Sequence, residues 1–268
     1  MIIDGNALVH RAFHALPPLS TKDGVLVNAV YGFTTVLMKA LKELTPAYAA
    51  VTFDLKGPTF RDALYKEYKA QRIKQPQELY DQLPLIKEVV TAFGIPVVEK
   101  SGFEADDVIA TLVQNSRTAK QQDSVENIIV TGDMDALQLV DEHTKVYSFR
   151  KGFSDTVIYD EQAVKERYGL TPAQIVDYKA LRGDPSDNIP GVKGIGEKTA
   201  TELLQRFGTL EEVYENVDKI SGRVGELLKT YQEDALLGKQ LVELKRDVEV
   251  GVTLPNCKFR PADPKILR

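Results

Sequence analysis

The chain has 268 residues, of which 43% are hydrophobic and 27% are charged, as is usual for a soluble globular protein. Its single cysteine, Cys257, excludes an internal disulfide framework, and no apolar run approaches the roughly 20 residues that a membrane-spanning helix needs. The first residues turn charged at Asp4 and do not resemble a signal peptide, so we expect a cytoplasmic protein without membrane contact. A formal net charge of −5 argues weakly against a nucleic-acid partner.

Four short runs rich in β-branched residues predict strands in the first part of the chain. They cover residues 1–4, 49–54, 95–100 and 127–133. Helical patterns lie between them, notably at 28–44 and 79–94, and such alternation indicates an α/β fold with a mostly parallel central sheet flanked by helices. Three of the runs end in an aspartate, and α/β proteins bind ligands beyond the carboxyl ends of their strands.

Beyond about residue 160 the strand pattern stops and helical patterns follow one another. We expect helices at 160–168, 172–182, 197–207, 209–217 and 223–244. The last stretch is proline-rich, basic and without periodicity, and is interpreted as a tail or linker. The expected organisation is an α/β core over 1–160, a helical region over 161–250 and a terminal segment over 251–268.

The most unusual feature is the number of carboxylates placed where strands end. The stretch "GFEADDVIA" brings three acids to the start of an apolar helix. Acids in a first turn also stabilise a helix by interacting with its dipole, which explains one or two of them. The stretches "TGDMDALQL" and "RGDPSDNIPG" add two aspartates each. The nine candidates are Asp4, Asp54, Glu104, Asp106, Asp107, Asp133, Asp135, Asp184 and Asp187. A role in a turn or cap explains Asp133 or Asp187 taken singly, but it explains the whole set poorly.

Nine like charges around one cleft require compensation, because two unit charges about 4 Å apart repel by ~4 kcal/mol at an effective dielectric of about 20. Hard divalent cations are the usual partners of clustered carboxylates. A site for two Mg²⁺ ions, with Mn²⁺ as a substitute and some acids acting through water, accounts for this many. An EF-hand calcium loop beginning at Asp133 is rejected, since Leu137 falls at a ligand position and Gln138 falls where glycine belongs.

The glycine-rich stretch "GVKGIGEKTA" does not form a nucleotide-binding P-loop, because Gly196 is followed by Glu197 and no strand precedes it. It suits a tight hairpin between two helices, in which backbone N–H groups approach a duplex phosphate without reading the sequence. The residues expected to contact DNA here are Gly191, Lys193, Gly194, Gly196, Lys198 and Thr199. An ordinary glycine turn is the alternative.

The stretch "FRDALYKEYKAQRIK" interleaves basic and aromatic side chains, a combination suited to single-stranded nucleic acid. As a helix over 60–74, it would place Tyr65, Lys69 and Arg72 on one face. Two further expected DNA contacts are Arg61 and Lys66. A solvated amphipathic helix is the common alternative. Without the nine candidate acids, 30 of the 39 acidic residues remain against 34 Lys and Arg, so the negative net charge is compatible with a phosphate-binding surface.

Seven motifs spread over nearly the whole chain form a recognisable set. They are "DGNALVHRAFHALPPL", "AVYGF", "TFD", "FRDALYKEYKAQR", "GFEADDVIATL", "TGDMDALQLV" and "LRGDPSDNIPGVKGIGEKTA". Together they resemble the 5′-nuclease (flap endonuclease) family, and within it the 5′→3′ exonuclease domain found at the N-terminal end of bacterial DNA polymerase I.

The resemblance implies a helical arch over about 60–90 that a 5′ single strand threads, and a helix–hairpin–helix over 172–207 that grips downstream duplex. It implies that one metal ion is held or surrounded by Asp4, Asp54, Glu104, Asp106 and Asp107, and that a second is served by Asp133, Asp135, Asp184 and Asp187. The side chains implied near the scissile phosphate are Arg11, Tyr68, Lys69 and Arg72. The hairpin carbonyls are implied to hold K⁺ or Na⁺. Met134 departs from the family pattern, which often has a basic residue there, so weaker charge compensation is expected.

The implied activity is structure-specific hydrolysis of phosphodiester bonds at 5′ flaps, nicks and RNA primers on DNA, in replication and repair. The resemblance implies a nucleoid-associated monomer that works with a DNA polymerase, either as a separate protein or as part of one chain. Two other functions stay open. A non-catalytic DNA-structure-binding module would not need all nine acids, and a nucleotide phosphatase would not need the hairpin or the basic stretch.

Overall fold

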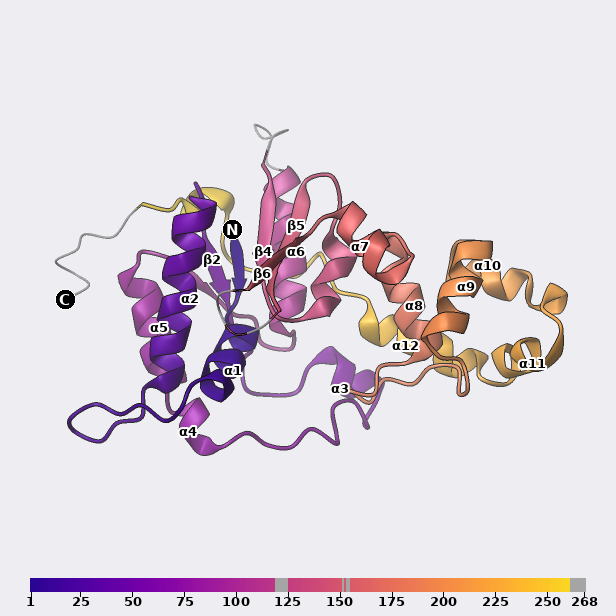
Figure 1. Cartoon of the computed structure of the whole chain (residues 1–268), viewed down its shortest axis with the longest axis horizontal. Coiled ribbons are helices and arrows are strands. Elements are labelled where there is room, and N and C mark those ends of the chain that lie inside the picture. Colours follow the sequence, from indigo (N-terminus) through magenta and orange to yellow (C-terminus); the bar gives the residue numbers. More distant parts are fainter. Residues whose placement is uncertain (119–124, 151, 153–154, 261–268) are drawn as a thin grey trace.

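The computed structural model describes residues 1–118, 125–150, 152 and 155–260. They form an α/β layer with a helical extension at one end, seen on the right in Figure 1. No helix in these described ranges is long and apolar enough to cross a membrane.

The described residues contain one six-stranded sheet with the strand order β3-β2-β1-β4-β5-β6. The strands are β1 (Ile2–Asp4), β2 (Ala50–Thr52), β3 (Val97–Val98), β4 (Asn127–Val130), β5 (Thr144–Phe149) and β6 (Thr156–Tyr159). The first five run parallel, and β6 pairs antiparallel with β5. The predicted mostly parallel sheet is confirmed, and β5 and β6 are additions that the sequence pattern did not indicate.

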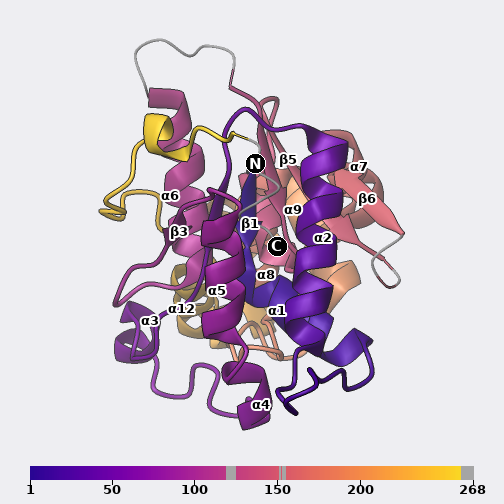
Figure 2. The same cartoon turned by 90° about the vertical axis from the view of Figure 1, so that its left-hand side faces the viewer.

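Both faces of the sheet are buried, because successive strand residues are apolar and point to opposite sides. Ile3 lies in the cluster on one face, and Ile2 lies in the cluster on the other. The helices that cover the face of Ile3 are α1 (Gly5–Ala15), α2 (Asn28–Leu44) and α5 (Leu83–Ala92). Figure 2 shows these three helices together on one side of the strands. The opposite face is covered by α6 (Ala105–Thr118).

The strand register brings the carboxyl ends of the central strands to one edge. Ile3 on β1 is level with Val51 on β2 and with Val130 on β4. The chain leaves β1 directly into α1, and the loop after β3 leads into α6 at the same edge. Side chains that follow these strands are therefore placed close together by the sheet itself.

The helical extension has its own apolar core, which includes Leu181, Leu204 and Leu228. Its helices are α7 (Glu161–Tyr168), α8 (Ile175–Arg182), α9 (Glu197–Phe207), α10 (Leu210–Glu215), α11 (Gly222–Thr230) and α12 (Gln232–Val242). The predicted helices are confirmed, except that the pattern over 223–244 is two helices. They break at Tyr231, whose backbone (φ −111°, ψ 27°) leaves the helical region.

The helix predicted over 60–74 is wrong beyond its first turns. Helix α3 (Phe60–Leu64) ends at Tyr65, which has extended backbone angles, and Lys69 lies in the left-handed region with φ 54°. The next helix is the short α4 (Gln77–Tyr80). We call residues 65–76 the arch segment; in Figure 1 it runs from α3 to α4 below the strands.

The arch segment loses its helical form because its backbone bonds elsewhere. The Lys69 N–H donates to the Asp187 carbonyl at 2.9 Å, and the Asn188 side-chain amide donates to the Glu67 carbonyl at 2.6 Å. Tyr68 is buried against Ile189 and the end of α12. The segment is thereby docked on the turn that follows α8.

The segment expected as a tail or linker packs against the α/β layer over part of its length. The Ala49 N–H donates to the Cys257 carbonyl at 2.8 Å, and the Phe259 N–H donates to the Ala47 carbonyl at 2.9 Å. Cys257 is buried in the core cluster behind α6. Residues 261–268 of this segment lie outside the described residues.

Candidate active site

Four predicted acids meet at the carboxyl edge of the sheet, and we call them the edge quartet: Asp4, Asp54, Asp106 and Asp133. Asp4 ends β1 and caps α1, accepting the Ala7 N–H at 2.9 Å. It also accepts the Thr131 hydroxyl, from the loop after β4, at 2.6 Å. Asp54 follows β2 and accepts the Ala105 N–H, at the start of α6, at 2.7 Å. These bonds connect the ends of neighbouring strands.

The edge quartet resists ionisation. Burial raises the pKa of Asp4 to about 7, and the charges of Asp133 and Asp54 act in the same direction. Burial, followed by the charge of Asp133, raises the pKa of Asp106 well above its ordinary value. The pKa values of Asp54 and Asp133 are also raised, mainly by burial. Within the described part of the chain, the ion pairs of this site all fall on other acids.

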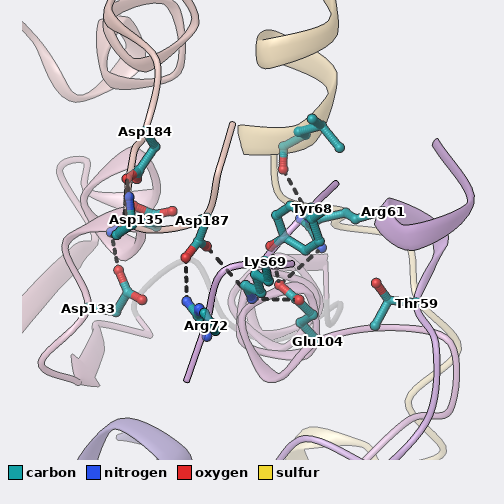
Figure 3. Close-up of polar contacts among 12 residues, drawn as sticks. Thr59, Arg61, Tyr68, Lys69, Arg72, Glu104, Asp133, Asp135, Asp184 and Asp187 are labelled. Atoms are coloured by element: carbon teal, nitrogen blue, oxygen red, sulfur yellow. Dashed lines mark hydrogen bonds and ion pairs between the residues drawn. The ribbon is translucent and has the colours of Figure 1, made fainter. Parts of the chain in front are cut away.

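A second set of acids, Glu104, Asp135, Asp184 and Asp187, is paired with cations of the chain (Figure 3). The Lys69 ammonium lies 2.6 Å from Glu104 and 3.7 Å from Asp187. Arg72 contacts Asp187 as well. Lys179 lies 2.8 Å from Asp184 and also contacts Asp135.

These pairs shape the protonation of the second set. Burial alone would raise the pKa of Asp184, but the Lys179 ammonium and two donors of Ser186 outweigh it and lower the pKa to about 2. Glu104 accepts the Tyr68 hydroxyl at 3.0 Å in addition to its bond from Lys69. The two sets thus differ in kind, because the acids of the second set form ion pairs with the chain's own cations and those of the edge quartet form none in the described residues.

Asp107, one of the acids predicted at a metal ion, joins neither set in this structure. Its side chain is fully buried, and Arg61 donates to both of its oxygens, at 2.7 and 2.9 Å. The backbone N–H groups of Lys245 and Glu104 donate to the same carboxylate at 2.9 and 3.2 Å. Four donors leave no free oxygen facing the other acids.

Arg61, a predicted DNA contact, is engaged in the same buried pair. It is 1% exposed, and its Nε donates to the Leu241 carbonyl at 2.7 Å. A guanidinium so enclosed cannot reach a DNA phosphate in this conformation. Arg61 instead joins α3 to α6 and to the end of α12. Lys66, by contrast, is exposed in the arch segment.

Arg11 projects from α1 toward the chain that leaves β5. Its guanidinium donates to the Gly152 carbonyl at 3.0 Å and lies 5.3 Å from the centre of the Phe149 ring. Burial lowers its pKa. The described contacts of Arg11 include none of the acids, so its expected place near the scissile phosphate stays a prediction.

The glycine-rich stretch forms a compact connection between α8 and α9. A Cβ on Gly191 would lie 2.2 Å from the backbone nitrogen of Gly183. The backbone segments at these two glycines therefore approach each other as closely as only glycine permits. Gly196 caps α9, and Lys193 and Lys198 on either side of it are exposed. This geometry fits the expected hairpin, whose contact with DNA stays a prediction.

Lys179 is the site residue that the sequence analysis missed. It lies on α8, five positions before Asp184, in the stretch "DYKALRGD". It also corrects the expectation for Met134, because it supplies positive charge beside Asp135 while Met134 packs against the apolar core. The only signal in the sequence was a lysine within one helical turn or so of an acidic motif, which is too common to single out.

The donors at the edge suit a divalent metal ion. They are carboxylate oxygens, the ligands that Mg²⁺ and Mn²⁺ prefer, and burial without a counter-cation leaves the edge quartet with raised pKa values. In the described residues, no three Asp, Glu, His or Cys side chains lie close enough to hold one ion together as they stand.

Comparisons with known proteins identify the family. Residues 1–169 match the model of the 5′-3′ exonuclease N-terminal resolvase-like domain, and residues 170–265 match that of the 5′-3′ exonuclease C-terminal SAM fold. The chain belongs to the 5′-3′ exonuclease family. The resemblance inferred from the motifs is therefore confirmed, and the chain is a phosphodiester hydrolase of the type found in DNA polymerase I.

Two relatives show how this exonuclease relates to longer proteins. It is 43% identical over 265 residues to DNA polymerase I of Mycobacterium bovis, covering 98% of this chain and 29% of the relative. It is 44% identical over 264 residues to DNA polymerase I of Bacillus caldotenax, covering 98% of this chain and 30% of the relative. The chain thus spans less than a third of the length of these relatives.

Solved structures share the fold at low sequence identity. The flap endonuclease of bacteriophage T5, in a pseudo-enzyme–product complex with DNA and metal ions, matches with a TM-score of 0.74 at 22% identity, over 90% of this chain and 88% of that one. The T5 D15 protein co-crystallized with metal ions matches with a TM-score of 0.72 at 22% identity, over 90% and 88%. These structural relatives bind metal ions.

The buried pair of Arg61 and Asp107 should be essential for stability and dispensable for chemistry. We expect Arg61→Met to lower the free energy of unfolding by about 3–5 kcal/mol, because it leaves a buried carboxylate without its partner. Denaturant unfolding measures this, and the double variant Arg61→Met/Asp107→Leu should recover part of the loss. Unchanged stability together with weakened DNA binding would instead support a DNA contact.

The raised pKa of Asp4 should make the metal-free protein less stable as pH rises. Its folded pKa of about 7 lies above the ordinary 3.8, so between these values the folded state holds a proton that the unfolded state has released. In chelator, we expect the free energy of unfolding to fall by up to about 4 kcal/mol from pH 4 to pH 8. Asp184, with a pKa of about 2, changes charge below this window.

The variant Asp4→Asn provides the control, since it should flatten this pH profile, and added Mg²⁺ should oppose the fall by favouring the ionised acids. A wild-type profile that stays level or rises over the same range would contradict the description of the edge quartet.

Proposed function

We propose that the exonuclease cleaves DNA at 5′ flaps and nicks and removes RNA primers paired with DNA, with two divalent ions, Mg²⁺ or Mn²⁺, at the carboxyl edge of the sheet. The observation that carries the proposal is the edge quartet, four neighbouring acids that have raised pKa values and no ion pair within the described chain. Such a cluster is stabilised by a bound divalent cation.

The residues proposed to hold one ion are Asp4, Asp54, Glu104 and Asp106, and those proposed for the other are Asp133, Asp135, Asp184 and Asp187. When bound, such ions lower the pKa of a coordinated water and stabilise the charge on the reacting phosphate. The protein scaffold fixes the acids for this task, because Asp4 and Asp54 are held by hydrogen bonds from neighbouring segments. Asp107 is excluded from the set by its bonds to Arg61.

The arch segment is proposed to present cations to the scissile phosphate. Lys69 and Arg72 lie at the acids already, paired with Glu104 and Asp187. A phosphate entering beside these acids would offer the two cations a stronger partner, and positioned cations stabilise charge that develops during phosphoryl transfer. Tyr68 belongs to the arch segment, and its buried, hydrogen-bonded contact with Glu104 fixes the position of the neighbouring Lys69. Arg11 is proposed to act at the same phosphate from α1.

The helical region is proposed to hold the duplex downstream of the cleaved bond. The exposed Lys193 and Lys198 flank the glycine hairpin, where backbone N–H groups and the start of α9 can face a phosphate. Hairpin carbonyls would hold K⁺ or Na⁺. We propose the division of the chain as a nuclease core over 1–160 and a DNA-binding region over 161–250.

A DNA polymerase is the proposed working partner, because the matched relatives are polymerases more than three times as long as the region they share with this chain. We propose that the exonuclease acts as a monomer in replication and repair. What the T5 relative binds, DNA and metal ions, supports the same substrate class here.

Neutralising one acid of the edge quartet should separate chemistry from binding. We expect Asp106→Asn to slow cleavage of a 5′-flap oligonucleotide about 100-fold or more, since it removes a ligand of the catalytic ion. Flap binding in Ca²⁺, measured by fluorescence anisotropy, should be retained. The matched control is Asp160→Asn, at an exposed helix cap that asparagine also serves. Cleavage by Asp106→Asn at the wild-type rate would remove Asp106 from the site.

Lys69 of the arch segment should affect the rate of cleavage more than the affinity for DNA. We expect Lys69→Ala to slow single-turnover cleavage about 100-fold or more while duplex affinity changes only slightly, because the ammonium serves one phosphate among many contacts. Lys42→Ala, an exposed lysine on α2 with no proposed role at the DNA, is the control. Equal losses of rate and affinity in Lys69→Ala would assign it to binding alone.

A further inference from the structure

Lys179 is placed where a metal ion would otherwise be expected. Its ammonium lies between the carboxylates of Asp184, at 2.8 Å, and Asp135, and its side chain is 13% exposed. It reaches them from α8, a helix of the extension, whereas Asp135 belongs to the 3-10 helix Met134–Leu139 that follows β4. The two carboxylates, which come from separate elements, fix the positive charge of the Lys179 ammonium at the position between them.

A cavity next to this pair has room for an ion and its waters. Its volume is about 440 Å³, and its lining includes Arg72, Asp133, Asp135, Lys179 and Asp187. Acids of both sets therefore border one cavity, together with the cations Arg72 and Lys179.

The two halves of the site consequently offer a divalent ion different conditions. Asp4, Asp54 and Asp106 have no ion pair in the described residues, and Lys69 and Arg72 act on Asp54 only from beyond ion-pair distance, so an entering cation has no ammonium to displace there. At Asp135 and Asp184 an entering cation meets the Lys179 ammonium and must displace it or share its partners. Two like charges a few ångströms apart repel by several RT even when partly screened by solvent.

We propose that Lys179 is a built-in competitor for the divalent ion at Asp135 and Asp184, so that this half of the site fills more weakly than the half that includes Asp4, Asp54 and Asp106. The inference rests on the divalent-ion site proposed above. Lys179 holds the two acids in place in the ion-free protein. It gives them up when an ion arrives together with the DNA phosphate, whose charge provides the ammonium with a new partner. Full loading of the site then depends on substrate.

The test is binding of Mn²⁺ alone to the full chain without DNA, followed by isothermal titration calorimetry. For wild type we expect a tighter and a weaker event. Lys179→Met should strengthen the weaker event at least about tenfold and leave the tighter one unchanged, because one repelling charge is removed. Lys179→Gln, which keeps a hydrogen-bond donor toward Asp184, should strengthen the weaker event in the same way. It replaces the methionine variant if that variant does not fold. Lys179→Arg keeps the charge and should keep the weak event.

Lys239→Met is the matched control, because Lys239 also lies between two carboxylates, 2.8 Å from Asp177 and 2.7 Å from Glu211, away from the site. It should not change Mn²⁺ binding. Unchanged Mn²⁺ affinity in both neutral Lys179 variants, or an equal gain in Lys239→Met, would overturn the proposal for Lys179. Absence of any Mn²⁺ binding to wild type would instead overturn the divalent-ion site itself.

Discussion

The structure depends on one constraint, which is that like-charged carboxylates are gathered at a single edge of a parallel sheet. Each parallel strand ends at this edge, so every aspartate that follows a strand is brought toward the others. The fold cannot relieve the repulsion by turning Asp4 to solvent, because this side chain is buried at the end of β1. The carboxylates at this edge consequently favour binding of either protons or metal cations.

The chain answers this constraint in two ways. Half of the acids are neutralised from within by Lys69, Arg72 and Lys179, while the edge quartet is left to take up protons or an external cation. Magnesium is thus not the only means of relieving the repulsion. This division between paired and unpaired acids suits a hydrolase, because the chain's own cations are also those that can contact the phosphate of a substrate.

The arch segment links the two parts of the molecule. It starts at α3, which Arg61 attaches to α6, and it docks through Lys69 and Tyr68 on the turn after α8. A helix would have been favoured locally by this sequence, but tertiary hydrogen bonds to Asp187 and from Asn188 outweigh that preference. The position of the arch cations therefore depends on the helical extension as much as on the nuclease core.

The sequence by itself determined the parallel sheet, the helices on both of its faces, and the gathering of Asp4, Asp54 and Asp133, because periodicity and strand-end position are local properties. Only the tertiary structure decided which acids are paired. Asp107 and Asp106 are neighbours in sequence, yet one is closed by Arg61 and the other faces the edge, since successive residues of a helix point in different directions. Lys179 and Asp135 are 44 positions apart, and no local pattern predicts that contact.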